Sequence, residues 1–273
     1  MKIFIVGLGL MGASYAQALS EKHDVYGYDI NPEVNLKAIT EGIIKSSDIL
    51  EIVTSDLVIL ALYPKENVSF IKTHQSLFKD QVLTDLSGTK EWMITEIEKL
   101  LPQSIDYISH HPMAGKETSG YAYKNKEMFQ NANFLIIPTS LTKEQGYQHL
   151  NEVYKDLSFG KKIIITAKEH DELIAFTSQL THVIAVSLVN SDTHEHTKEA
   201  TGDSYRDLTR IAKINEIMWT ELFIENKEKL INEMDKVISE LNVMKELIKK
   251  EDKTSIQEKL ILSTQRRKAL DRN

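Results

Sequence analysis

The chain contains no cysteine among its 273 residues. This absence excludes disulfide bonds, thiolate metal ligands and cysteine nucleophiles, and it fits a cytoplasmic location. Long hydrophobic runs are also missing, since no apolar stretch approaches the roughly 20 residues of a membrane-spanning helix. Excess positive charge is missing too, because the formal net charge is −7. We therefore expect no membrane segment and no nucleic-acid surface, which would need a basic face.

The remaining composition is that of a globular protein, with 41% hydrophobic and 27% charged residues. At this length the chain can form two domains. His194 and His196 are spaced two apart, but no third ligand lies nearby in the sequence. We therefore predict no metal site.

A glycine-rich loop follows the first apolar segment. Residues 2–6 form a short apolar run typical of a buried parallel strand, and G-L-G-L-M-G follows at residues 7–12, before a helical pattern. In such a loop the first glycine allows a tight turn, the second lets backbone approach a pyrophosphate, and the third lets the helix pack on the strand. We expect the cofactor to contact Gly7, Gly9, Leu10, Met11 and Gly12.

An acidic residue follows the second predicted strand, Asp24 to Tyr28, at Asp29. It lies about 20 residues past the loop, where a carboxylate accepts hydrogen bonds from ribose hydroxyls. Because a carboxylate repels a 2′-phosphate, this position favours NAD over NADP as the cofactor. The alternative is that Asp29 caps the helix that begins near Pro32.

The alternation of strands and helices continues to Thr166. Further strands are predicted at residues 57–62, 82–86, 106–109, 134–138 and 162–166, with helices at residues 67–78 and 92–101. This pattern predicts an α/β Rossmann-type domain over residues 1–166, with a mostly parallel sheet. The polar turn at residues 85–90 and the pair His110 and His111 follow strands, so both belong to the ligand side of the sheet.

Residues 167–273 carry no strand signal and predict an all-helical second domain. The segment 168–190 suits a buried helix, on which Ser178 and His182 share one face; they either line a pocket or are satisfied core residues. Residues 202–213 predict another helix, on which Asp207 and Arg210 can pair. A long amphipathic helix is predicted at residues 221–247, and we expect it to pack in a domain that also dimerises. The charged tail from Lys249 predicts a solvated helix.

The order of these motifs resembles the prephenate dehydrogenase family. The motifs are G-L-G-L-M-G, D-L-S-G-T-K, H-P-M-A-G-K-E-T-S-G, S-Q-L-T-H and Y-R-D-L-T-R-I-A, and they cover nearly the whole chain. The resemblance implies NAD-dependent oxidative decarboxylation of prephenate to 4-hydroxyphenylpyruvate in tyrosine biosynthesis, or the same reaction of the amino analogue arogenate. It also implies a homodimer formed through the helical domain.

The resemblance further implies roles for single residues. His111, directly before the proline, matches the catalytic histidine, and Arg210 matches the arginine that grips a substrate carboxylate. The other matched substrate-binding positions are Ser178, His182, Glu117, Asp207 and Trp219. One departure concerns the loop serine that orients the catalytic histidine, because the usual Gly-Ser is here Ser87-Gly88. Ser87 or Thr89 must supply that contact, or no residue does.

Two rival functions remain open from the sequence. One is another dehydrogenase with a Rossmann domain and a helical domain, for example one that acts on 3-hydroxy acids. Such enzymes use a lysine on the interdomain helix, where this chain carries Ser178 and His182. The other is a dinucleotide-sensing module without catalysis, which has no need for His111, Arg210 and Glu117 together.

Overall fold

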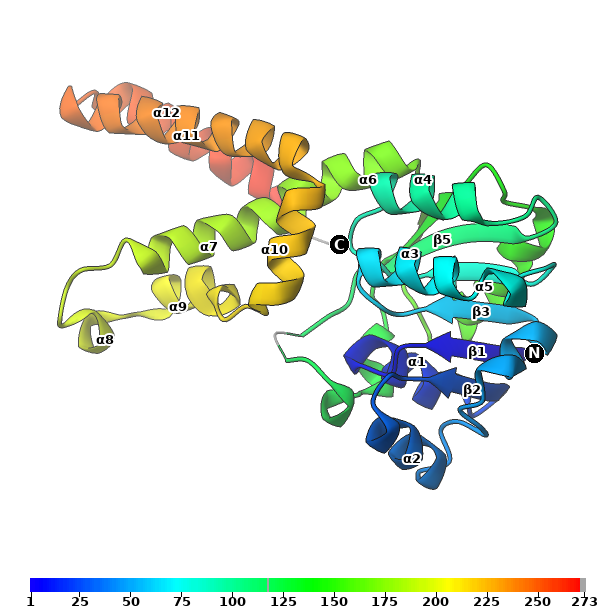
Figure 1. Cartoon of the computed structure of the whole chain (residues 1–273). Helices are drawn as coiled ribbons and strands as arrows, with labels where there is room; N and C mark the ends of the chain where they lie inside the picture. The colour runs from blue at the N-terminus through cyan, green and yellow to red at the C-terminus, as the bar shows by residue number, and fades with distance from the viewer. Residues whose placement is uncertain (117, 271–273) are drawn as a thin grey trace. The chain divides into compact units, whose positions relative to one another are not determined.

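The computed structural model describes residues 1–116 and 118–270 (Figure 1). The chain divides into two compact units, Met1–Asn226 and Lys227–Asn273. The first contains the sheet and most of the helices, and the second contains two helices. The predicted domain boundary at Thr166 lies within the first unit, where Thr166 caps helix α6 (Ala167–Ile174), and it stays a prediction.

A seven-stranded sheet forms the centre of the first unit, in the order β2-β1-β3-β4-β5-β6-β7 (Figure 1). The strands are β1 (Lys2–Val6), β2 (Asp24–Tyr28), β3 (Leu57–Leu60), β4 (Val82–Asp85), β5 (Asp106–Pro112), β6 (Phe134–Pro138) and β7 (Lys162–Ile164). All neighbours are parallel except β5 and β6, which pair antiparallel. The predicted Rossmann-type, mostly parallel sheet is therefore confirmed.

Helices cover both faces of this sheet because side chains alternate along each strand. In β1, Ile3 and Ile5 pack into one core with α1 and α5, whereas Phe4 and Val6 pack into the other with α3 and α4. The helices are α1 (Leu10–Leu19), α2 (Pro32–Thr40), α3 (Pro64–Thr73), α4 (Glu91–Leu100) and α5 (Glu144–Asp156). Short 3-10 helices occupy Ile49–Thr54, Gln75–Leu77, Tyr121–Tyr123, Lys126–Phe129 and Arg210–Ala212.

Strand β5 is longer than predicted. The sequence predicted its end at Ser109, but it continues to Pro112 because β6 pairs along this extension, with His111 opposite Leu135 and Pro112 opposite Phe134. Both histidines therefore lie within a strand and point to opposite faces. This alternation gives His110 and His111 different surroundings.

The predicted helix 168–190 is a continuous helical run with an irregular centre. Helix α6 leads into a π-helical turn, Ala175–Gln179, and then into α7 (Leu180–Asn190). Contrary to the expectation from sequence, this run is long and apolar enough to cross a membrane by length and composition. A core helix of a soluble protein passes the same test, so the run does not identify a membrane protein. The remaining helices of this unit are α8 (Thr197–Ala200), α9 (Asp203–Thr209) and α10 (Glu216–Glu225).

The predicted single helix over residues 221–247 is wrong. Helix α10 ends at Glu225, and α11 (Lys227–Lys249) begins after Asn226. Asn226 is buried, and its side-chain amide donates to the backbone oxygen of Asp171 and to Oε1 of Gln179, both at 2.8 Å. Asparagine favours such helix ends because its side chain competes for main-chain hydrogen bonds.

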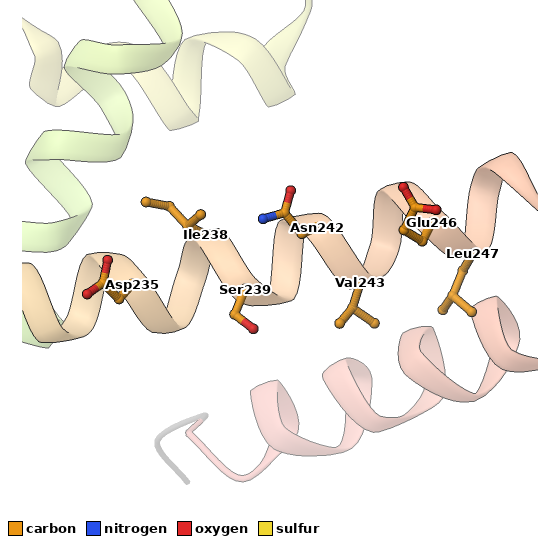
Figure 2. Close-up of a pocket in the computed structure, with 7 residues that line it drawn as sticks. All are labelled: Asp235, Ile238, Ser239, Asn242, Val243, Glu246 and Leu247. Carbon is orange, nitrogen blue, oxygen red and sulfur yellow. The ribbon is translucent and has the colours of Figure 1, made fainter.

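The second unit consists of α11 and α12 (Lys253–Lys268), which pack against each other. Glu251 adopts a positive φ of 53° in the turn between them, and Lys259 of α12 pairs with Glu240 of α11 at 2.8 Å. An open hollow of about 540 Å³ follows α11 and is lined by Ile238, Val243 and Leu247 together with polar side chains (Figure 2). This unit therefore exposes apolar surface along one helix.

Candidate active site

The glycine loop has the geometry that a dinucleotide requires. Gly7 has φ 90°, and a Cβ there would lie 2.6 Å from Cδ2 of Leu62. A Cβ on Gly12 would lie 1.8 Å from the Gly7 oxygen, so only glycine permits this contact of helix and strand. At Gly9 a Cβ would meet nothing within 4 Å, and no side chain caps the start of α1. The loop thus leaves open backbone and helix amides for a phosphate group.

Asp29 lies directly after β2 and contacts the same loop. Its Oδ2 accepts a hydrogen bond from the Leu8 amide at 2.9 Å, and its Oδ1 accepts one from the Asn31 amide at 2.9 Å. The side chain that caps α2 is Asn31, which accepts from the Glu33 amide. The alternative role of Asp29 as that cap is therefore not what the structure shows.

The two adjacent histidines of β5 have different surroundings. His110 is fully buried, with Nε2 2.9 Å from the Tyr15 hydroxyl and Nδ1 2.7 Å from the Thr84 hydroxyl. Burial lowers the pKa of His110 well below 6.5, and the positive charge of Lys90 lowers it further. Both ring nitrogens are thus used in the core, and His110 acts as a structural residue.

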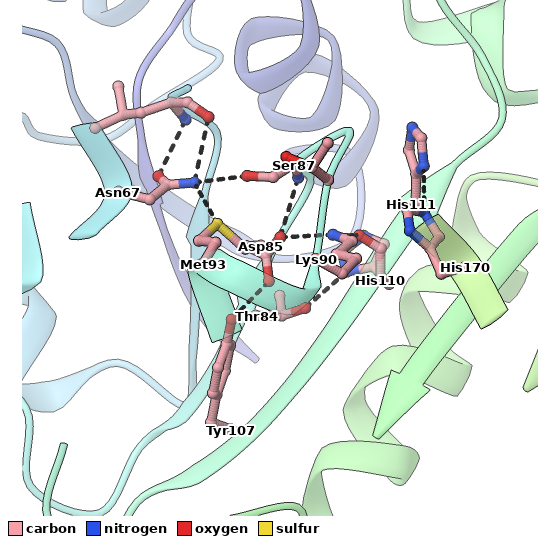
Figure 3. A network of polar contacts seen from close by, with 12 residues as sticks. Asn67, Thr84, Asp85, Ser87, Lys90, Met93, Tyr107, His110, His111 and His170 are labelled. Carbon is pink, nitrogen blue, oxygen red and sulfur yellow. Dashed lines mark hydrogen bonds and ion pairs between the residues drawn. The ribbon is translucent and has the colours of Figure 1, made fainter. Parts of the chain in front are cut away.

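His111 keeps part of its surface accessible and meets a second histidine (Figure 3). Its Nδ1 lies 2.8 Å from Nε2 of His170, on the first turn of α6. Nδ1 of His170 lies 2.7 Å from Oδ1 of Asp171. Burial lowers the pKa of His111 well below 6.5, and the neighbouring His170 and Lys90 add to the effect. His111 is therefore a neutral imidazole near pH 7.

A buried ion pair joins the ends of β4 and β5 beside the hydrogen-bonded group of His111, His170 and Asp171 (Figure 3). Lys90 is fully buried, and its Nζ donates to Oδ1 of Asp85 at 2.6 Å and to the His110 backbone oxygen at 2.8 Å. The Tyr107 hydroxyl donates to the other Asp85 oxygen at 2.9 Å. Burial lowers the pKa of Lys90, whereas Asp85 opposes that shift. Removing either partner would leave a buried charge unpaired.

The two loop hydroxyls expected near His111 have other partners. Nδ2 of Asn67 donates to Oγ of Ser87 at 2.9 Å, and Oγ1 of Thr89 donates to Oε2 of Glu225 at 2.6 Å. In the described part of the chain, the polar partner of the His111 ring is thus His170. Among the described residues, neither Ser87 nor Thr89 forms a hydrogen bond with the His111 ring.

Helix α10 approaches the same loops through two carboxylates. Oε1 of Glu221 accepts from the Lys65 amide at 3.0 Å, where α3 begins, and Glu225 accepts from Thr89. Burial raises the pKa of Glu225 to about 7; the Thr89 hydrogen bond opposes this shift, and the negative charge of Glu221 adds to it. The loops after β3 and β4 are thus tied to one helix.

The helical segment brings part of the expected substrate set together. His182 stacks on Trp219 of α10, with ring centroids 3.8 Å apart. Its Nδ1 donates to the backbone oxygen of Ser178, one turn earlier, at 2.9 Å. Ser178 itself lies in the π-helical turn, a feature frequent at functional sites. These three residues therefore form one group.

Two of the remaining predicted substrate residues lie on short helices that pack against α7. Asp207 belongs to α9, and Arg210 begins the short 3-10 helix that follows it. Both are exposed. Glu117 lies outside the described residues. The substrate roles of Arg210, Asp207 and Glu117 stay predictions.

Comparison with known proteins identifies the family. The family "Prephenate dehydrogenase, nucleotide-binding domain" matches residues 13–164, and "Prephenate dehydrogenase, dimerization domain" matches residues 166–262. The chain belongs to the prephenate dehydrogenase family. The nucleotide-binding match precedes the dimerisation match along the chain, so the predicted order of the two domains is confirmed.

Individual relatives agree with this membership. A prephenate dehydrogenase of Lactococcus lactis is 33% identical over 94% of this chain and 73% of its own length. A cyclohexadienyl dehydrogenase of Zymomonas mobilis is 27% identical over 92% of this chain and 89% of its own. The crystal structure of A. aeolicus prephenate dehydrogenase in complex with hydroxyphenyl propionate and NAD+ is 29% identical, covers 99% of this chain and 98% of its own, and has a TM-score of 0.89.

The sequence analysis did not identify several buried residues that form this site. The missed residues are Asn67, Lys90, His170, Asp171, Gln179 and Asn226, all of them buried. The sequence E-H-D at residues 169–171 carried a usable signal, because adjacent His and Asp are unusual in a buried turn. Asn226 and Gln179 bond each other across 47 residues, whereas Lys90 lies only five residues from its partner Asp85, within the polar turn placed on the ligand side.

Proposed function

We propose that this protein catalyses the NAD-dependent oxidative decarboxylation of prephenate to 4-hydroxyphenylpyruvate. One observation carries the proposal beyond family membership. A neutral imidazole, His111, lies at the carboxyl side of β5 with Nδ1 engaged by His170, so its Nε2 remains for a substrate hydroxyl. A general base needs a group in this state.

The residues have separate tasks in the proposed reaction. Nε2 of His111 accepts a hydrogen bond from the C4 hydroxyl of the ring and takes its proton as positive charge develops there. Hydride leaves C4, the ring carboxylate leaves as carbon dioxide, and the aromatic phenol oxygen regains the proton. NAD, when bound, accepts the hydride. General base assistance of this kind contributes about 10²–10⁴-fold in rate.

The glycine loop and Asp29 support NAD as the cofactor. Asp29 is held beside the loop by the Leu8 amide, where its negative charge disfavours a 2′-phosphate. We expect Asp29→Ala to raise the Kd for NAD about tenfold, because a charge-assisted hydrogen bond is lost. The Kd for NADP should change less. Equal affinity of the unaltered protein for both cofactors, measured by titration, would contradict this assignment.

Arg210 supplies a guanidinium for a substrate carboxylate, and the stacked pair of His182 and Trp219 supplies a pocket wall. Ser178, Asp207 and Glu117 complete the proposed substrate set. Arogenate is the second candidate substrate. It is supported by the similarity to a relative named for the cyclohexadienyl ring that both compounds share. Only the keto or amino group of the side chain separates the two.

The helical domain supports a homodimer. It matches a dimerisation domain, and it exposes apolar side chains such as Ile224 and Leu241. A second copy of the same chain would cover such a surface. The acidic net charge and the absence of cysteine support a cytoplasmic enzyme whose ligands are small molecules rather than nucleic acids or membranes.

A direct assay tests the proposal. Purified protein is mixed with prephenate or arogenate and with NAD or NADP, and the absorbance at 340 nm is followed. We expect the fastest reaction with prephenate and NAD. The product is identified separately as 4-hydroxyphenylpyruvate by chromatography. Absence of NADH or NADPH formation with both substrates and both cofactors, in protein that binds NAD, would overturn the proposed reaction.

A further inference from the structure

His111, His170 and Asp171 form a continuous chain of hydrogen bonds, and none of them depends on a bound ligand. We propose that His170 and Asp171 are positioning residues that hold His111 in the tautomer whose Nε2 carries the lone pair. This inference rests on the proposed function, in which His111 is the base. Its central claim concerns a proton position, which can be measured without turnover.

The direction of each hydrogen bond follows from the partners of Asp171. Its Oδ1 accepts from the Lys90 amide at 2.9 Å, and its Oδ2 accepts from the Glu91 amide at 2.9 Å. Because a carboxylate only accepts hydrogen bonds, the nearby Nδ1 of His170 must donate. In a neutral imidazole the other nitrogen is then the acceptor. Nε2 of His170 therefore accepts the proton of Nδ1 of His111.

Because a neutral imidazole has one donor and one acceptor nitrogen, the same reasoning determines the tautomer of His111. If Nδ1 of His111 carries the proton, Nε2 has the lone pair that a base needs. The argument requires both rings to be neutral. Burial lowers the pKa of His170 well below 6.5, as it does for His111, and Lys90 contributes to both shifts. Near pH 7 both rings therefore carry one proton each.

His170 and Asp171, at the acceptor end of this series of hydrogen bonds, are held in place by the surrounding helices. Thr166 and Glu169 form a reciprocal cap at the start of α6, and the His170 amide bonds the Thr166 oxygen at 2.9 Å. The carboxylate of Asp171 receives the first amides of α4, and Asn226 donates to its backbone oxygen. His170 is fully buried. The position and tautomer of His111 are thus set by two helices that carry no other assigned catalytic group.

Three variants separate the tautomer from other effects. Asp171→Leu removes the acceptor of Nδ1 of His170, so His170 no longer has to present Nε2 as an acceptor and His111 is free to carry its proton on Nε2. His170→Leu removes the acceptor. His170→Gln retains it, because the glutamine carbonyl oxygen can reach about as far as imidazole Nε2. His74→Gln, at the end of α3, serves as the control for histidine replacement.

The first readout is ¹⁵N NMR of labelled histidine in the substrate-free protein, assigned by comparison with His111→Ala. In the unaltered protein, His170→Gln and His74→Gln, we expect the His111 Nε2 resonance to be that of an unprotonated nitrogen. In Asp171→Leu and His170→Leu it should shift towards that of a protonated nitrogen. A protonated Nε2 in the unaltered protein near pH 7 would overturn the proposal, whatever the activity.

The second readout is steady-state kinetics. We expect kcat to fall by roughly 10²-fold or more in Asp171→Leu and His170→Leu, with KM and NAD affinity little changed. His170→Gln should recover most of the lost rate. Equal losses in His170→Gln and His170→Leu would overturn the positioning role, and the same pair decides the question if Asp171→Leu fails to fold. If the protein showed the expected NMR pattern but no dehydrogenase activity, the proposed function would be refuted. The inference that His170 and Asp171 set the tautomer of His111 would still hold.

Discussion

The nucleotide-binding half and the helical half of this protein bury their apolar side chains to different extents. Through residue 166 the described chain packs most of its large apolar residues into two cores, one on each face of the sheet. In the helical half, few are buried, and Phe176, Ile224 and Leu241 are among those more than half exposed. The first half thus encloses most of its apolar side chains in its own two cores, whereas the helical half leaves many of its own exposed.

This difference explains where the two kinds of functional residue lie. His111 belongs to a strand that is paired on both sides and is fixed by buried partners. Arg210 and Asp207 lie on exposed short helices of the other half. We infer that the nucleotide-binding half carries the base, that α6 of the helical half holds it in place, and that the rest of the helical half supplies substrate contacts. The following changes test this division.

The largest effect is expected within β5 itself. His111→Ala should lower kcat by about 10²–10⁴-fold, because the general base is lost, while NAD affinity stays unchanged. His110→Ala should instead lower the free energy of unfolding by roughly 3 kcal/mol, since it leaves a cavity and two buried hydroxyls without their ring partner. Turnover of the folded His110 variant should stay within about threefold of the unaltered protein. Kinetics and urea unfolding of both variants measure this contrast.

A reversal of these two outcomes would contradict the assignment of the base. If His111→Ala retained its kcat, the imidazole would have no part in the reaction. If His110→Ala lost kcat while keeping its stability, the catalytic ring would belong to the other face of β5.

Arg210→Ala should act on binding rather than on chemistry. Loss of a charged hydrogen bond to the substrate should raise KM roughly 10- to 100-fold, with a smaller change in kcat. Arg206→Ala is the matched control, because Arg206 lies on the same helical segment and pairs with Asp203 on the surface. An unchanged KM in Arg210→Ala, or an equal rise in both variants, would remove the proposed carboxylate clamp.

A pair of leucine substitutions tests the exposed surface of the helical half. Leu241 of α11 is 64% exposed and Leu50 of the nucleotide-binding half is 62% exposed, so the two are matched in accessibility. Leu241→Lys should weaken a homodimer formed through the helices, whereas Leu50→Lys should not. Sedimentation velocity over a range of concentrations measures the monomer fraction. Equal behaviour of both variants would exclude this part of α11 from the dimer interface.

The sequence predicted the nucleotide-binding half well because its signals are local. Strands of continuous apolar residues and a glycine loop each fit within about ten residues. The loop requires glycine at Gly7 and Gly12 because a Cβ atom there would collide with neighbouring atoms. The extension of β5 was not predicted because it depends on pairing with β6, which follows more than 20 residues later in sequence. A pattern within one strand contains no information about that partner.

The helical half and the support of His111 were less accessible from sequence. An uninterrupted apolar pattern predicted one helix across Asn226, whereas the break depends on Asp171 and Gln179, more than 40 residues away. The contact of His170 with His111 likewise joins residues 59 apart. The family resemblance pointed to hydroxyls at Ser87 and Thr89, but the structure gives them to Asn67 and Glu225. Polar networks of this kind are determined by tertiary packing rather than by local pattern.

The smallest expected effect concerns Glu225 of α10. Its carboxyl group accepts a hydrogen bond from Thr89, in the loop after β4. Glu225 has a pKa of about 7 in the folded protein, raised from 4.5 chiefly by burial. The folded state therefore holds this proton more tightly than the unfolded chain. Its contribution to stability is complete below about pH 4.5 and is lost as the pH rises through about 7.

Glu225→Gln cannot lose that proton, so we expect it to be more stable than the unaltered protein at pH 8 and to lose this advantage towards pH 5. Glu216→Gln, an exposed position on the same helix, should give parallel unfolding curves at both pH values. Urea unfolding at pH 5 and pH 8 measures the difference. An equal difference at the two pH values would mean that the Glu225 carboxyl does not titrate between them, and that the contact of α10 with Thr89 holds independently of pH in this range. In that case the buried carboxyl group would keep one charge state from pH 5 to pH 8, despite the burial of its side chain.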